Sequence, residues 1–185
     1  PFGTGNHRMK NIKQVYIIGG PMGVGKTTAC RMMKNRLNRC VFLDGDWCWD
    51  MHPFQVTEDT KKMVMENIAF LLNQFIHCPA FDTIVFCWVL HQQEILSDLL
   101  SRLDKTQCHF HLISLVCEEK ELEKRVMSDV QKGLRDENAV EKSLSYLPLY
   151  ENLMTSKLDV TGLTPEQTAE RIVRMEAAVP LDKSP

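Results

Sequence analysis

Apolar residues recur along this chain with two different spacings, which predict strands that alternate with helices. Short runs rich in β-branched and aromatic residues predict buried strands, and residues 83–89 are apolar enough to be buried on both faces of a sheet. Longer segments between these runs carry apolar residues every three or four positions and predict helices. The predicted strands are residues 14–18, 40–43, 83–89, 109–116 and 157–160, and the predicted helices are residues 26–37, 57–76, 92–103, 118–132, 136–157 and a last helix opening at 164–166. The helix over residues 136–157 is expected to be bent or broken near Pro148.

This alternation favours one α/β domain, in which helices cover both faces of a parallel sheet of about five strands. Residues 9–178 are assigned to that domain. Residues 1–8 are polar and glycine-rich, so they are expected to precede a natural start at Met9, and residues 179–185 are expected to form a tail. The side chains expected on the buried face of the helix over residues 57–76 are Met63, Met65, Ile68, Leu71, Leu72 and Phe75.

A glycine-rich segment separates the first predicted strand from the first predicted helix. Residues 20–28 read Gly-Pro-Met-Gly-Val-Gly-Lys-Thr-Thr, which fits the pattern of Gly, any four residues, Gly, Lys and Ser or Thr. Glycines let successive backbone amides face one anion at the positive end of a helix dipole. A glycine turn that matches by chance is the weaker interpretation, because strand and helix flank the motif in the required order. The residues predicted to bind nucleotide phosphates are Gly20, Gly23, Val24, Gly25, Lys26, Thr27 and Thr28.

Two side chains of this loop have distinct predicted roles. Lys26 is predicted to be catalytic, because its point charge can reach the β- and γ-phosphates of a nucleotide. The Thr27 hydroxyl is predicted to be a ligand of Mg²⁺. ATP and Mg²⁺ are therefore the expected cofactors.

A second candidate motif, Asp44-Gly45-Asp46, directly follows the second predicted strand. Ligands of parallel sheets gather beyond the carboxyl ends of the strands, so this turn is expected to lie beside the phosphate loop. Asp44 is predicted to serve the metal and the substrate side, and Asp46 to orient or deprotonate a hydroxyl acceptor. Asp and Gly also favour plain solvated turns, but the preceding phosphate loop makes the functional interpretation stronger.

The phosphate loop and Phe42-Leu43-Asp44-Gly45-Asp46 together resemble the P-loop small-molecule kinases. Gluconate kinases have a similar Leu-Asp-Gly-Asp followed by His-Pro, as in His52-Pro53, adenylylsulfate kinases share Leu-Asp-Gly-Asp, and shikimate kinases have a related Asp-x-Asp. Chloramphenicol phosphotransferase has a looser likeness. The resemblance implies a three-layer P-loop NTP hydrolase/kinase fold with a small helical lid. It also implies that Asp46 is the general base and that Asp44 lies near the metal.

Aromatic residues near this motif are candidates for the acceptor site. Trp47, Trp49 and Trp88 can form a wall for a flat or apolar acceptor, with core packing as the alternative, which is equally open for Trp88. His52 and His91 are further candidate contacts, although a lone His near a strand end is more often a structural hydrogen-bonding group. Trp49 stands where adenylylsulfate kinases have Arg, so the acceptor is left open among a sugar acid, a nucleoside or nucleotide, and an antibiotic.

The resemblance also implies a lid after the fourth strand that brings arginines to the transferring phosphoryl group. Arg125 on the charged helix over residues 118–132, and Arg135 after Gly133, are the predicted catalytic arginines. Gly133 is the expected hinge. A solvated charged helix is the alternative, but the planar guanidinium suits phosphate better than a solvated lysine does.

Composition and charge narrow the partners. The net charge of -2 gives no indication of nucleic-acid or anionic-membrane binding, and the chain has no apolar run long enough to span a bilayer. Seven scattered cysteines without Cys-x-x-Cys spacing favour neither a zinc site nor a disulfide framework, and they suit a reducing cytoplasm. A small-molecule acceptor and a monomer or homodimer are expected.

A regulatory nucleotide-binding ATPase or switch that acts through a protein partner is the alternative function. A GTPase would need an Asn-Lys-x-Asp motif, which this sequence lacks. The third predicted strand has no acidic residue at its end, where motor ATPases usually hold metal, but a small kinase tolerates this if Asp44 serves the metal. Phosphoryl transfer to a small-molecule hydroxyl is the leading hypothesis.

Overall fold

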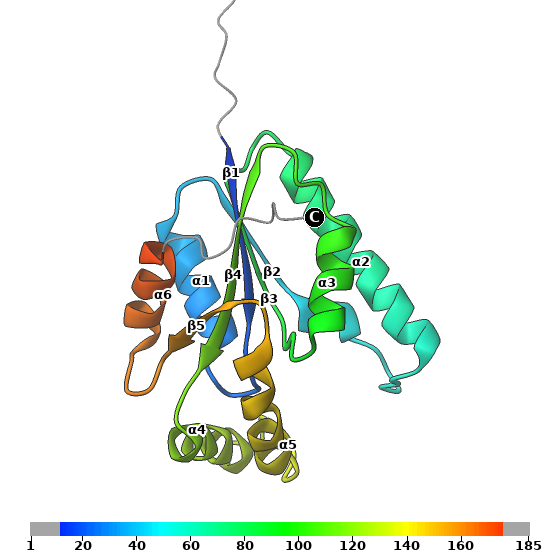
Figure 1. Cartoon of the computed structure of the whole chain (residues 1–185). Helices are drawn as coiled ribbons and strands as arrows, with labels where there is room; N and C mark the ends of the chain where they lie inside the picture. Colours follow the sequence, from blue (N-terminus) through cyan, green and yellow to red (C-terminus); the bar gives the residue numbers. More distant parts are fainter. Residues whose placement is uncertain (1–11, 176–185) are drawn as a thin grey trace, which may run out of the picture.

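A five-stranded parallel sheet with the order β2-β3-β1-β4-β5 forms the centre of the fold (Figure 1). The computed structural model describes residues 12–175, so the expectations for residues 1–8 and 179–185 lie outside the described residues. The strands are β1 (Lys13–Gly19), β2 (Cys40–Asp44), β3 (Thr83–Cys87), β4 (Cys108–Val116) and β5 (Ser156–Asp159). The helices are α1 (Lys26–Arg36), α2 (Glu58–His77), α3 (Gln93–Ser101), α4 (Glu119–Gln131), α5 (Ala139–Tyr146) and α6 (Pro165–Arg174), with 3₁₀ helices η1 (Gly45–Trp49) and η2 (Leu147–Asn152).

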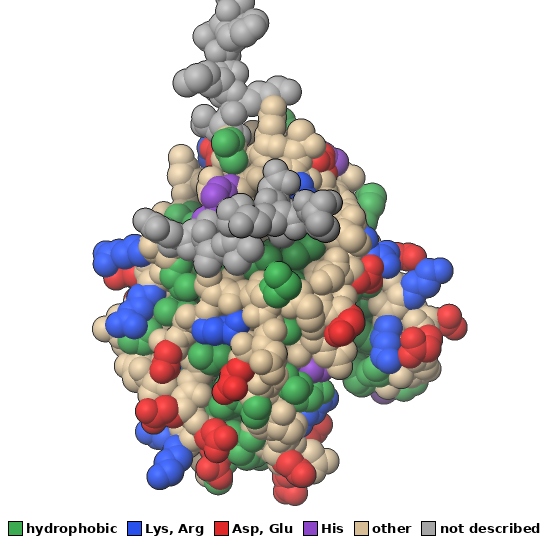
Figure 2. All heavy atoms as spheres, in the orientation of Figure 1, with side chains coloured by type: hydrophobic (Ala, Val, Ile, Leu, Met, Phe, Trp, Pro, Cys, Tyr) green, Lys and Arg blue, Asp and Glu red, His purple; other side chains and the backbone are tan. Residues whose placement is uncertain are grey.

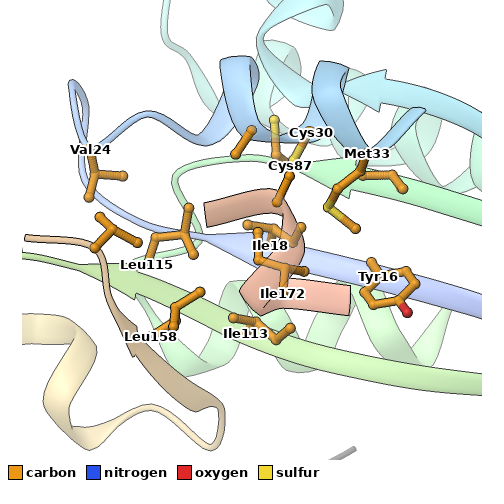
Figure 3. Packing of buried hydrophobic residues seen from close by; sticks show 14 of the residues in the cluster. Tyr16, Ile18, Val24, Cys30, Met33, Cys87, Ile113, Leu115, Leu158 and Ile172 are labelled. Carbon is orange, nitrogen blue, oxygen red and sulfur yellow. The ribbon is translucent and has the colours of Figure 1, made fainter. Parts of the chain in front are cut away.

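Both faces of the sheet are buried, because side chains alternate between two apolar layers along each strand. On β1, Tyr16 and Ile18 pack in the layer that holds α1 and α6, whereas Val15 and Ile17 pack in the layer that holds α2 and α3. Figure 3 shows the first layer, where Ile18 lies among side chains of the neighbouring strands and of both helices. The three-layer α/β architecture predicted from the sequence is therefore confirmed.

Helix boundaries follow from local capping. Thr57 starts α2 and Thr164 starts α6, each through a reciprocal capping box in which the threonine side chain accepts from the third helical backbone amide. Pro165 occupies the first helical position of α6, where its missing amide costs nothing. The helical segment predicted over residues 136–157, with a bend or break near Pro148, is α5 followed by the 3₁₀ helix η2, which contains Pro148.

The expected buried face of α2 needs one correction. Met63 is 42% exposed, and its neighbour Val64 is fully buried in its place. Met63 therefore lies on the outward face of α2. Met65, Ile68 and Leu72 are buried as expected.

The two motifs to which the sequence assigned chemistry lie at the carboxyl edge of the sheet. The phosphate loop leaves β1 there and Asp44 ends β2 there, with β3 between these two strands. Helices α4 and α5 lie beyond this edge, at the bottom of Figure 1, and the buried side chains of Leu122 and Val126 anchor α4 to the domain. On the face seen in Figure 2, acidic and basic side chains are interspersed. No helix within residues 12–175 is long and apolar enough to cross a membrane.

Candidate active site

The loop between β1 and α1 takes a shape that only glycine permits at two positions. Gly23 has φ of 83°, and an added Cβ would come within 2.5 Å of the Val126 side chain on α4. Gly25 has φ of 102° and is the N-cap of α1, with open space around the position of a Cβ. Because this cap residue has no side chain, the first backbone amides of α1 have no side-chain partner. They are free to bind an anion.

Lys26 is held against its own loop. Its Nζ donates to the carbonyl oxygens of Gly20 at 2.7 Å and of Pro21 at 2.8 Å. Burial lowers the pKa of Lys26, and nearby acidic groups, Asp46 among them, act in the opposite direction. A desolvated ammonium at the mouth of a loop of free amides has the chemistry of a phosphate site.

Asp44 joins the two motifs. Its side chain is buried, and its Oδ2 accepts a hydrogen bond of 2.6 Å from the Thr27 hydroxyl at the start of α1. Its Oδ1 accepts from the backbone amide of Asp46 at 3.1 Å, which caps η1. The two motifs therefore meet at one point, where the Thr27 hydroxyl and the Asp44 carboxylate supply the oxygen ligands that Mg²⁺ prefers.

Asp46 opens toward the cavity beside the loop. Burial raises the pKa of its carboxyl group above the ordinary value of 3.8, and the neighbouring Asp44 raises it further. Lys26, Arg135 and a hydrogen bond from the Trp88 side chain oppose this rise. A carboxylate with a raised pKa and with cations close by is suited to take a proton from a hydroxyl group.

Trp88 explains the glycine between the two aspartates. A Cβ at position 45 would lie 2.6 Å from the Trp88 ring, so the indole packs directly on the Gly45 backbone. Trp88 also contacts the apolar layer beneath α2 and α3. It therefore supports the Asp-Gly-Asp turn from below and does not line the cavity.

A cavity of about 1080 Å³ extends from the phosphate loop across η1 to α4 and α5. The predicted site residues that line it are Gly23, Gly25, Lys26, Thr27, Thr28, Asp46, Trp47, Trp49, Arg125 and Arg135. The predicted residues that lie outside its lining are Gly20, Val24, Asp44, His52 and Trp88. Val24 is buried beneath the loop, and His52 is exposed on the segment that leads to α2.

The two predicted arginines occupy different places. Arg125 donates from Nε to Glu121, from Nη1 to the Val24 carbonyl at 3.0 Å and from Nη2 to the Val160 carbonyl at 3.2 Å. Its guanidinium therefore braces the phosphate loop against the segment after β5.

Arg135 donates from Nε to Asp129 at 2.9 Å, and its charge acts on the pKa values of both Lys26 and Asp46. Arg135 is among the residues that line the cavity. Gly133, with φ of 70°, lies between α4 and this arginine.

Tyr146 and Phe54 of the cavity wall were not singled out by the sequence, whereas His91 was a candidate contact. His91 and Tyr146 stack with ring centroids 4.2 Å apart and planes within 5°, and Phe54 lies near Trp49. Burial lowers the pKa of His91, and Lys142 lowers it further, so the neutral imidazole is favoured. Tyr146 comes from α5, far along the chain, and no local spacing could have paired it with His91.

Comparison with known proteins settles the family. The sequence profile of the AAA domain family matches residues 17–143, which is more than half of the chain. The chain belongs to this family. No curated protein sequence matches it.

Solved structures with the same fold include P-loop kinases. The tunicamycin resistance protein of Deinococcus radiodurans is 18% identical, with a TM-score of 0.61 over 91% of this chain and 99% of that one. A gluconokinase from Sinorhizobium meliloti is 14% identical, with a TM-score of 0.62 over 88% and 91% of the two chains. The shikimate kinase of Acinetobacter baumannii is 20% identical, with a TM-score of 0.55 over 88% and 92%. These similarities confirm the P-loop fold that the motifs implied.

The bond between Thr27 and Asp44 is testable by its contribution to stability. Thr27→Val keeps the shape of the side chain but leaves the buried carboxylate without its hydroxyl donor, so the free energy of unfolding should fall by about 1–3 kcal/mol. Thr28→Val, which changes the neighbouring exposed hydroxyl, should stay within about 0.5 kcal/mol of the parent. Urea unfolding without nucleotide or metal measures both values, and equal losses in the two variants would contradict the assignment.

The raised pKa of Asp46 predicts a stability that depends on pH. Because the pKa is higher in the folded than in the unfolded state, the ionised carboxylate destabilises the fold at neutral pH, and this penalty disappears below about pH 4. Asp46→Asn keeps an oxygen that can accept from Trp88 and should therefore raise the midpoint of thermal unfolding at pH 7. The gain should shrink as the pH falls toward 4. A variant that is less stable at pH 7, or a difference independent of pH, would count against a strained Asp46.

Proposed function

We propose that this protein is an ATP-dependent kinase that transfers the γ-phosphoryl group to a hydroxyl group of a small molecule. The observation that carries the proposal is the 2.6 Å bond between Thr27 and Asp44. It fixes the phosphate loop to the acidic turn, so that Lys26 and Asp46 line the same cavity. A phosphoryl donor and a hydroxyl acceptor can therefore meet in one place.

The residues present fit a magnesium–nucleotide complex. Free amides at the start of α1 and the ammonium of Lys26 suit the phosphates, and the oxygens of Thr27 and Asp44 suit the metal. When bound, ATP supplies the phosphoryl group and Mg²⁺ offsets its negative charge. An anion here would also give the desolvated Lys26 ammonium a partner that it now finds only in backbone carbonyls.

Asp46 is proposed as the general base. Its carboxylate lines the cavity and would take the proton of the acceptor hydroxyl as that oxygen bonds to the γ-phosphorus of ATP. The bond from the γ-phosphorus to the β–γ bridging oxygen would break in the same transfer, so that ADP leaves. Burial and the Asp44 charge raise its pKa, which makes the carboxylate a stronger proton acceptor than an ordinary aspartate. Asp44 is already engaged by Thr27 and by the backbone of η1, so it supports the metal side of the site.

The arginines are proposed to divide their work. Arg135 is assigned to the charge that develops on the transferred group, because its guanidinium acts on both Lys26 and Asp46. Arg125 is assigned to the nucleotide side, where its bonds to Val24 and Val160 hold the loop. Movement about Gly133 would bring Arg135 closer without disturbing Arg125.

The acceptor is proposed to lie against the aromatic part of the cavity. Trp47, Trp49 and the stacked pair of His91 and Tyr146 form walls beyond Asp46. A cavity of this size suits a small acceptor, whereas a protein-coupled switch needs no acceptor pocket. Structural neighbours described as a gluconokinase and a shikimate kinase support small hydroxyl-bearing acceptors as a class. Seven free cysteines support a reducing cytoplasm as the place of action.

The test is ATP turnover measured against a panel of sugar acids, nucleosides, nucleotides and hydroxylated antibiotics. The kinase proposal predicts ADP release that depends on one acceptor class and a phosphorylated product seen by mass spectrometry. Asp46→Asn should reduce this turnover by about 10²- to 10⁴-fold while ATP still binds. Lys26→Ala should weaken ATP binding itself.

Three results would contradict parts of the kinase proposal. Turnover that needs no acceptor but rises with a protein from the same cell would favour the regulatory ATPase. Full turnover by Asp46→Asn would contradict the assignment of Asp46 as the general base. Unchanged ATP affinity in Lys26→Ala would contradict the assignment of the phosphate loop.

A further inference from the structure

A second, shallower cavity of about 460 Å³ lies between η1 and the outward face of α2. Most of its lining is apolar, and Asp50 is the one charged side chain among the lining residues. Those residues are Trp47, Cys48, Asp50, Met51, Met63, Asn67, Phe70 and Leu71. We refer to this cavity as the α2 groove.

Large apolar side chains are left exposed along this groove. Phe70 is 63% exposed, Met63 is 42% exposed and Trp47 is 50% exposed. Met63 and Phe70 are seven residues apart on α2 and therefore lie on one face of the helix, two turns from each other. Met63 was expected on the buried face of α2, but it is exposed and lines the groove. Exposed apolar residues that gather beside a cavity mark a binding surface.

The α2 groove adjoins the proposed active-site cavity. Trp47 and Asp50 line both spaces, so the two spaces meet at these residues. The Trp47 ring packs against Phe42 of β2 in a T-shaped arrangement, with centroids 5.3 Å apart and planes at 69°. The indole therefore lies at the boundary between the two spaces.

We propose that the α2 groove binds an apolar arm of the phosphoryl acceptor, and this inference rests on the proposed function. The acceptor class is then an amphiphilic alcohol. Its hydroxyl end lies at Asp46, and its alkyl or aryl arm crosses Trp47 to contact Met63 and Phe70. The groove offers such an arm apolar contact and one amide, from Asn67.

A single ligand arm fits these observations better than a second copy of the chain. The apolar strip on α2 is narrow, because the charged side chains of Lys62 and Glu66 pair beside it and are both exposed. A stable interface between protein chains needs a broad buried core. A boundary shared with the active-site cavity, in contrast, is required only for a substrate.

The probe is a series of linear primary alcohols from n-butanol to n-octanol, titrated calorimetrically into the full chain without nucleotide. Each added methylene that reaches the groove should tighten binding about two- to fourfold. Phe70→Ser and Met63→Ser replace exposed side chains and should flatten this dependence on chain length. Met154→Ser, which replaces a methionine that is 64% exposed and lines neither cavity, should keep it.

Three results would overturn the inference. The first is affinity that does not depend on chain length, and the second is the same dependence in the Phe70→Ser and Met63→Ser variants. The third is a self-associating protein that Phe70→Ser dissociates without any chain-length effect, which would make the groove an interface between copies.

This test separates the groove from the kinase proposal, because alcohol binding is read without turnover. If binding depends on chain length but the protein phosphorylates nothing, the groove is still a binding site for apolar chains. The kinase proposal, and with it the acceptor as the occupant of the groove, is then rejected. If an acceptor without an apolar arm is phosphorylated, and Phe70→Ser leaves its kcat/KM unchanged, the groove inference fails and the kinase stands.

Discussion

The hydrogen bond from the Thr27 hydroxyl to the buried Asp44 carboxylate is the contact on which the rest of the site depends. A buried carboxylate is costly unless its oxygens are hydrogen-bonded, and here one oxygen accepts from α1 and the other from the start of η1. The first helix and the end of β2 are thereby fixed to each other at the carboxyl edge of the sheet. The orientation of Asp46, two residues later, follows from this attachment.

Helices α4 and α5 are also attached to the phosphate loop by hydrogen bonds. Arg125 joins the phosphate loop to the segment after β5, and Ser143 of α5 donates to the Met22 carbonyl of that loop. Helices α4 and α5 are therefore both bonded to the backbone of the phosphate loop. Arg135 lies between them and bonds to Asp129, which leaves its charge directed at the cavity.

The sequence was sufficient for the parts of the site that depend on local spacing. A phosphate site of this kind requires a strand, a glycine loop and a helix to follow one another along the chain, as they do here. The Asp-Gly-Asp turn follows a strand that ends at the same edge of the sheet. It was not sufficient where the fold joins distant segments, as with His91 and Tyr146, or where a residue acts through packing. Trp88 is the example, because the packing of its ring on Gly45 is visible only in the folded structure. The exposure of Met63 on α2 also escaped prediction, because Met63 and its buried neighbour Val64 are both apolar.

Thr27 and Asp44 are proposed to hold the Mg²⁺ that accompanies ATP in this loop. Calorimetric titration of ATP with and without Mg²⁺, into the parent protein and into Asp44→Asn, tests this role directly. We expect Mg²⁺ to tighten ATP binding to the parent and the variant to lose about 10- to 100-fold of this gain. An equal gain from Mg²⁺ in both proteins would contradict it.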